Sequence, residues 1–179
     1  MKTLLATSLL LLAGLVLADA NEGEMGGYRL GDIYPLNDAS RYEAVADRSW
    51  KIKAQQAVVP ADMDSAYVYA TPATQTIGKI IFRKDFASAA EAEAAAMVQK
   101  QRLEAAYPDW EVLKAPIPMG RQGGAMVSRQ RQGAYALIVF YKSTDDGAEL
   151  VVELEFESSS PERKAWRAQL KAEATAGTS

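Results

Sequence analysis

The 179-residue sequence contains no cysteine and no histidine. Without cysteine, the chain can form no disulfide, offer no reactive thiol and carry no lipid on a cysteine. Without histidine, it lacks the usual general base near neutral pH, which excludes Ser-His-Asp and Cys-His nucleophile systems. The two absences together also exclude a conventional zinc site. We therefore expect no cofactor and no metal, and any catalysis would have to use carboxylates, lysine, tyrosine or serine.

Long apolar runs are also scarce, and the one that stands out lies at the N-terminus. Lys2 precedes an apolar stretch over Leu4–Leu17, which is followed by Ala18-Asp19-Ala20. A short basic region, an apolar region and a small-x-small site together make up a secretory signal peptide. The run is too short for a good transmembrane helix. We predict a signal peptide over 1–20 that is cleaved after Ala20, no transmembrane anchor, and a mature protein in the periplasm or secreted.

The chain after residue 20 has the length of one domain. Its formal net charge of −3 is that of a mildly acidic protein, which argues against nucleic acid and anionic membranes as partners. Residues 21–48 are rich in turn residues and predict an irregular lead-in that begins with a mobile Asn21–Gly27. Residues 49–174 predict a single domain, and residues 175–179 a frayed tail.

Two helices are predicted, at 88–107 and at 161–174. Ser88 and Glu91 have the spacing of a capping box at the start of the first helix. Pro108 ends it, because proline cannot donate to the helix ladder and restricts the residue before it. The apolar side of this helix is mostly alanine, which predicts a close approach to whatever it covers. The second helix opens with Ser-Pro-Glu, a favourable N-cap sequence.

Around the helices the pattern changes to the period of two that is typical of strands. Strands are predicted at Tyr67–Ala70, Ile77–Arg83, 125–131, Ala134–Lys142 and 150–157, with weaker strand patterns near Trp50 and Trp110. In the last of these main strands apolar residues alternate with glutamates, so one face is core and the other acidic. The sequence predicts an α+β domain: a mostly antiparallel sheet of five or six strands, the first helix on one face and the second closing an edge or end.

The acidic face of that strand is the first candidate site. Its members are Glu149, Glu153, Glu155 and Glu157, and the cations expected opposite them on the same sheet are Arg129 and Arg131. The pattern favours a solvated sheet face with cross-strand ion pairs, because one wet face is normal for antiparallel sheets. Two alternatives stay open. The face could bind a cation or a basic partner, or it could hold a pair of glycosidase-type carboxylates.

The second candidate site is aromatic. Tyr67 and Tyr69 point one way from their strand, and Tyr135 and Tyr141 point one way from the central strand. A tyrosine-lined groove for a glycan or a peptide is one interpretation, and core packing is the more frequent one. The glycine-rich segment 120–124 lacks the Lys-Ser/Thr ending of a P-loop and is interpreted as a loop. The aspartate pairs at 62/64 and 145/146 lack EF-hand spacing and are interpreted as turns.

Three stretches together resemble a known group of proteins. They are Tyr69-Ala-Thr-Pro72, Ile77–Ile81, and Phe86-Ala-Ser-Ala-Ala-Glu-Ala92 continuing to Tyr107. The group comprises small uncharacterised periplasmic or secreted proteins of proteobacteria, in which a strand hairpin, an Ala/Glu/Lys-rich helix ending in tyrosine and further strands follow a signal peptide. The resemblance covers about half of the chain and rests on structural motifs. It implies an α+β fold and an envelope location, and it brings no catalytic residues.

Two classes of function follow from these observations. The first is an exported, non-catalytic binding or accessory protein of the cell envelope that contacts another protein or a peptide. The second is a small periplasmic hydrolase or glycan-active enzyme that uses carboxylates and tyrosine. The missing histidine and cysteine favour the first class. A deep cleft that holds two carboxylates with raised pKa values would favour the second.

Overall fold

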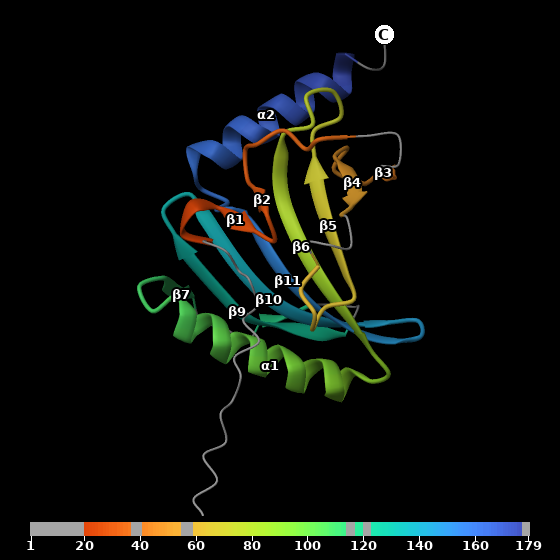
Figure 1. Cartoon of the computed structure of the whole chain (residues 1–179), viewed down its shortest axis with the longest axis vertical. Helices are drawn as coiled ribbons and strands as arrows, with labels where there is room; N and C mark the ends of the chain where they lie inside the picture. The colour runs from red at the N-terminus through yellow and green to blue at the C-terminus, as the bar shows by residue number, and fades with distance from the viewer. Residues whose placement is uncertain (1–19, 37–40, 55–58, 114–116, 120–122, 177–179) are drawn as a thin grey trace, which may run out of the picture.

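The computed structural model describes residues 20–36, 41–54, 59–113, 117–119 and 123–176. Within these residues, nine strands form one antiparallel sheet that curves through the molecule (Figure 1). In spatial order the strands are β3 (Tyr42–Ala44), β4 (Trp50–Lys53), β5 (Ser65–Ala70), β6 (Ile77–Phe86), β11 (Gly147–Phe156), β10 (Tyr135–Thr144), β9 (Gly124–Gln132) and β7 (Glu111–Leu113), with β8 (Ile117–Pro118) also paired to β9. The predicted α+β class with an antiparallel sheet is therefore confirmed.

The predicted number of five or six strands is wrong, because the edges of the sheet carry short strands. At one edge β3 pairs with β4, and at the other both β7 and β8 pair with β9. Strand β7 lies at the weak strand pattern near Trp110. Strands β3 and β8, of three and two residues, hold too little alternation to be recognised from sequence, and pairing with a longer neighbour is what forms them.

Helix α1 (Ala89–Ala106) begins and ends within a residue of its prediction. The Ser88 hydroxyl accepts from the amide N–H of Glu91, and the chain leaves the helix just before Pro108. Its buried side chains are Ala92, Ala96, Gln99 and Leu103. Since three of these four belong to the predicted alanine-rich side, the helix packs with the expected face against β9, β10 and β11.

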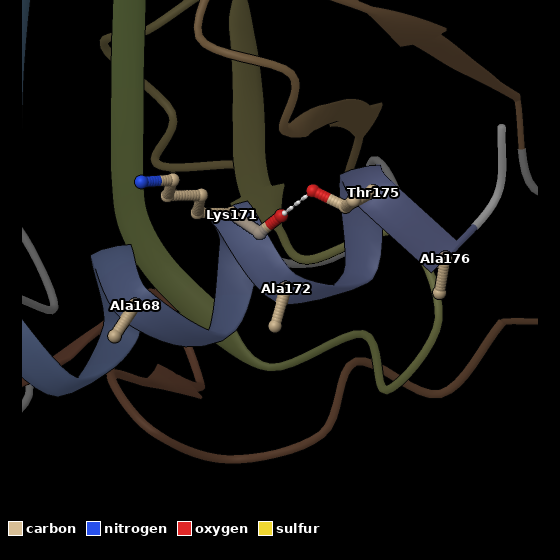
Figure 2. Close-up of a pocket in the computed structure, with 5 residues that line it drawn as sticks. All are labelled: Ala168, Lys171, Ala172, Thr175 and Ala176. Atoms are coloured by element: carbon tan, nitrogen blue, oxygen red, sulfur yellow. Dashed lines mark hydrogen bonds between the residues drawn. The ribbon is translucent and has the colours of Figure 1, made fainter.

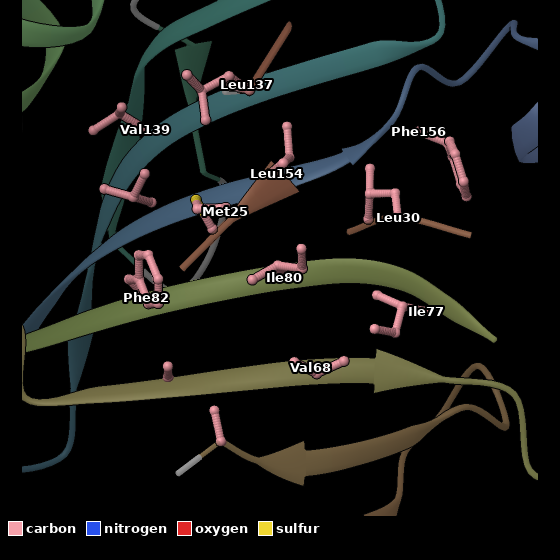
Figure 3. Packing of buried hydrophobic residues seen from close by; sticks show 14 of the residues in the cluster. Met25, Leu30, Val68, Ile77, Ile80, Phe82, Leu137, Val139, Leu154 and Phe156 are labelled. Carbon is pink, nitrogen blue, oxygen red and sulfur yellow. The ribbon is translucent and has the colours of Figure 1, made fainter. Parts of the chain in front are cut away.

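The hydrophobic core lies on the α1 side of the sheet. Its largest fully buried side chains include Phe82, Ile80, Val68 and Leu137, which come from neighbouring strands (Figure 3). Met25 packs among them, although it belongs to the stretch that was expected to be mobile.

The start of the lead-in, residues 20–29, has regular secondary structure where an irregular segment was expected. It forms the short helix η1 (Ala20–Glu22) and a small hairpin of β1 (Glu24–Met25) and β2 (Tyr28–Arg29). The physical reason is that this segment supplies apolar side chains, Met25 and Leu30 among them, to the core.

Helix α2 (Pro161–Ala176) lies at the opposite end of the molecule from α1 (Figure 1). It extends two residues beyond the predicted end, into the stretch expected to fray, and residues 177–179 lie outside the described chain. The predicted signal peptide also lies outside it, except for Ala20.

Candidate functional site

The acidic face of β11 is not solvated, which corrects the interpretation that the sequence favoured. Glu149, Glu153, Glu155 and Glu157 are only 5–8% exposed. The reason is that β11 lies in the middle of the sheet, between β6 and β10, so long side chains from both neighbours extend over its glutamates.

Each of these glutamates is paired with a cation. The pairs and their N–O distances are Lys79 with Glu153 (3.1 Å), Arg163 with Glu155 (2.9 Å), Lys142 with Glu149 (2.6 Å) and Arg129 with Glu157 (3.1 Å). Arg131, the other predicted cation, instead pairs with Glu111 on β7 at 2.7 Å. Buried charges persist in proteins when they are paired in this way. The cations of the sheet and of α2 therefore compensate the negative charge of the four glutamates.

One of these carboxyls, that of Glu153, has a raised pKa. Burial raises the pKa of Glu153, and the nearby Lys79 ammonium opposes this rise. A raised carboxyl pKa is a property of many general acids. However, neither of the two pockets described below is lined by Glu153 or Glu155. Glu153 and Glu155 therefore have the geometry of structural ion pairs within a sheet.

The four tyrosines do not share a groove. Tyr135 and Tyr141 pair across the strands with Phe156 and Leu150 and pack against the hydrophobic core. Tyr67 and Tyr69 lie on the other face, where cationic side chains cover the rings: Lys51 and Arg83 approach Tyr67 to 4.6 and 5.0 Å, and Lys79 approaches Tyr69 to 5.5 Å. Contacts of this kind are cation–π interactions that hold a ring in place. These four tyrosines therefore pack within the fold, as the more frequent interpretation has it, and they do not form the groove that was the alternative.

A pocket of about 600 Å³ lies along the outer side of α2. Figure 2 shows its lining, which consists of Ala168, Lys171, Ala172, Thr175 and Ala176. The Thr175 hydroxyl donates to the main-chain carbonyl of Lys171 at 2.9 Å, so its proton is already used within the helix. An open alanine surface with one ammonium offers little specific chemistry.

A second pocket, of about 470 Å³, has a different character. It lies between α2 and the β3–β4 turn, and its lining is Asp47, Arg48, Arg163, Trp166, Arg167, Leu170 and Lys171. We call it the basic groove, because four of these seven side chains are cations and one is a carboxylate. Trp166 and Leu170 are buried and form its apolar floor, whereas Arg48, Arg167 and Lys171 are exposed.

Local sequence determines how α2 forms this groove. Ser160 caps the helix, since its hydroxyl accepts from the amide of Arg163 at 3.0 Å. Arg163, Arg167 and Lys171 then follow at intervals of four, which places them along one side of a helix.

Contacts with the sheet fix the position of α2. The indole N–H of Trp166 donates to the Thr76 carbonyl at 3.0 Å, and its ring lies directly against Gly78. Near the other end of the helix, the Glu173 carboxylate accepts from the amides of Ala73 and Thr74 at 2.7 and 3.2 Å. These bonds join α2 to the β5–β6 loop at several points, so its cations project from a fixed helix.

The β3–β4 turn forms the other wall. The Arg48 amide donates to the Val45 carbonyl at 2.8 Å, and the Val45 amide donates to the Ser49 carbonyl at 3.0 Å. Asp47 accepts from the Ser49 amide at 2.9 Å, so this carboxylate serves the turn. Arg48 has a φ of 71°, in the left-handed region that glycine or asparagine normally occupies.

The charges of the groove are only partly compensated. Arg163 pairs with Glu155 at one end, but its Nε and Nη1 are buried without a hydrogen bond, so that contact is mainly Coulombic. Within the part of the chain that the structure describes, no carboxylate pairs with Arg48, Arg167 or Lys171. The sequence carried one signal for this site, the spacing of the α2 cations at intervals of four, and this signal was not recognised from the sequence.

Neither a metal site among the described residues nor a related protein identifies a ligand. No group of three or more Asp or Glu side chains among the described residues could hold a metal ion. Within the same residues, every helix is too short or too polar to cross a membrane. No protein-family model matches the chain, and neither a curated protein nor a solved structure matches it significantly.

Proposed function

We propose that this protein is an exported, non-catalytic binding protein of the cell envelope, and that the basic groove is its binding site for an anionic partner. The observation that carries the proposal is the set of three exposed cations, Arg48, Arg167 and Lys171, around an apolar floor, none with a carboxylate partner among the described residues. A ligand with negative charge and some apolar surface complements such a groove.

The charge of the whole chain strengthens this interpretation. The formal net charge is −3, yet the groove concentrates cations on a small area. Glutamates elsewhere, such as those of β11, lie beneath their own cations. A cluster of cations on an acidic protein attracts an anionic partner to that cluster and gives orientation to the encounter.

A hydrolase or glycan-active enzyme finds less support. Such an enzyme needs two accessible carboxylates on either side of a substrate. Glu153 and Glu155 are buried and form ion pairs with Lys79 and Arg163, and neither lines the basic groove. The cell-envelope location comes from the Leu4–Leu17 run and the Ala18-Asp19-Ala20 site.

Comparative affinity capture from envelope extract tests the proposal. The bait is the tagged protein, and the altered bait carries Arg167→Glu. The control is Arg102→Glu, an identical charge change on α1, where the arginine makes only an exposed pair with Asp62 at 3.4 Å.

We expect partners to bind the unchanged protein and the Arg102→Glu bait, and to be lost from the Arg167→Glu bait. Capture that is equal with all three baits would remove the groove from the account. Turnover of a chromogenic ester or glycoside that Glu153→Gln abolishes would favour the enzyme class instead.

A further inference from the structure

The spacing of the cations in the basic groove restricts the kind of anion that it can hold. This step rests on the proposed function, since it assumes that the groove binds a partner. We propose that the occupant is an extended acidic peptide segment whose carboxylates stand at alternate positions, with apolar residues between them.

Spacing is the first argument. Arg167 and Lys171 are four residues apart on one side of α2, so their backbone positions are separated by about 6 Å along the helix axis. In an extended peptide, side chains on the same side recur every second residue, at about 6.5–7 Å. Two carboxylates at alternate positions therefore match this pair of cations. A compact anion such as a single phosphate would be matched better by cations that converge on one point.

The two walls give the second argument. Arg48 comes from the β3–β4 turn and the other cations come from α2, so two elements contribute positive charge to the lining of the groove. An extended chain also directs its intervening residues away from the carboxylates. The floor residues Trp166 and Leu170 are apolar and almost fully buried, so they leave no polar group unpaired beneath apolar side chains that stand between the carboxylates.

The conformation of Arg48 supports a role for its side chain. A non-glycine residue at a φ of 71° is uncommon and costs conformational energy, whereas glycine would adopt it freely. The turn itself is closed by main-chain bonds and by Asp47, and needs no guanidinium. Arg48→Gly should thus separate the stability of the turn from the binding of the anion. We expect this variant to keep or raise stability and to weaken binding.

Fluorescence anisotropy with labelled peptides tests the inference on the purified chain. The probe is Glu-Leu-Glu-Leu-Glu with neutral flanks, and the comparison peptide is Glu-Glu-Leu-Leu-Glu, which has the same composition but no carboxylates two residues apart. We expect the alternating peptide to bind about fivefold more tightly, the gain from one additional exposed ion pair. Arg167→Glu should weaken it about tenfold and Arg48→Gly about threefold, and Arg102→Glu should leave it unchanged.

Several results would overturn the inference. Equal affinity for the two peptides would show that net charge alone is recognised. Tighter binding of tripolyphosphate than of the alternating peptide, lost in Arg167→Glu, would assign the groove to phosphate. In both cases the proposed binding function survives, because the groove still binds an anion. If no peptide or phosphate binds and capture from envelope extract is also unaffected by Arg167→Glu, the proposed function fails together with this inference.

Discussion

Replacement of Gly78 by alanine tests how α2 is docked on the sheet. A Cβ at this position would lie 2.0 Å from Cε2 of Trp166 and 2.4 Å from Cδ2, far inside van der Waals contact. The Trp166 indole cannot move freely, because its N–H donates to the Thr76 carbonyl and its ring lies under α2. Gly78→Ala must therefore displace the indole, and with it the helix.

The expected cost follows from two opposing effects. Overpacking of an interior by one methyl costs about 1–3 kcal/mol, and displacement of a buried tryptophan moves the value to the upper part of that range. Gly78 is not at a positive φ, so alanine would fit the backbone and recover about 0.5–1 kcal/mol of conformational entropy. We expect Gly78→Ala to lower the free energy of unfolding by about 2 kcal/mol.

Urea denaturation followed by far-UV circular dichroism measures this cost, and a double-mutant cycle assigns it. Trp166→Ala is destabilising by itself, because it removes a buried indole. In the Trp166→Ala background, however, the added Cβ at Gly78 has room, so Gly78→Ala should cost almost nothing there. If the two changes are additive, the contact between this glycine and the indole does not hold α2, and our account of the groove floor is refuted.

Three further changes test other parts of the structure. Ala96→Leu should overpack the contact between α1 and the sheet and cost about 1–3 kcal/mol in urea titrations, whereas the exposed Gln101→Leu should cost little; equal losses would mean that the helix packs with another face. Burial raises the pKa of Glu153 above its unfolded value, so the stability that its protonated form contributes is lost as pH rises from the unfolded pKa through the folded one. Glu153→Gln should therefore gain stability relative to the unchanged protein as the pH rises above about 4; a relative loss on raising the pH would contradict the sign. N-terminal sequencing of protein from the periplasmic fraction should begin at Asn21, and a chain that retains residues 1–20 there would disprove the processing site.

Local chemistry made the helices of this fold predictable. The Ser88 cap, the alanine side of α1 and the stop at Pro108 each depend on neighbours within a few residues. The alternation in β11 likewise predicted which residues face away from the core.

The burial of the β11 glutamates beneath cationic side chains could not be predicted in the same way. The exposure of Glu153 depends on the register of β6, which places Lys79 beside it. The exposure of Glu155 depends on the packing of α2, which places Arg163 beside it. Alternation with a period of two predicts on which face of a strand a side chain lies, but it does not predict which strands lie beside that strand.

The basic groove illustrates the same limit more sharply. Arg48 and Arg167 are far apart in the sequence and meet only because β3 and β4 extend the sheet beside α2. The spacing of the α2 cations was visible, but the same pattern marks any solvated helix face. Only the tertiary arrangement shows that an apolar floor and a second cationic wall lie beside it.

An NMR titration tests the central claim, that the basic groove is the binding site, most directly. The ¹⁵N-labelled protein is titrated with the Glu-Leu-Glu-Leu-Glu peptide, and the Trp166 indole N–H in the groove floor serves as the reporter. We predict that the largest chemical-shift changes fall on that indole and on the amides of Arg48, Arg167 and Lys171. Changes that concentrate on the β11 glutamates or on α1, with the Trp166 indole signal unmoved at saturation, would contradict the account.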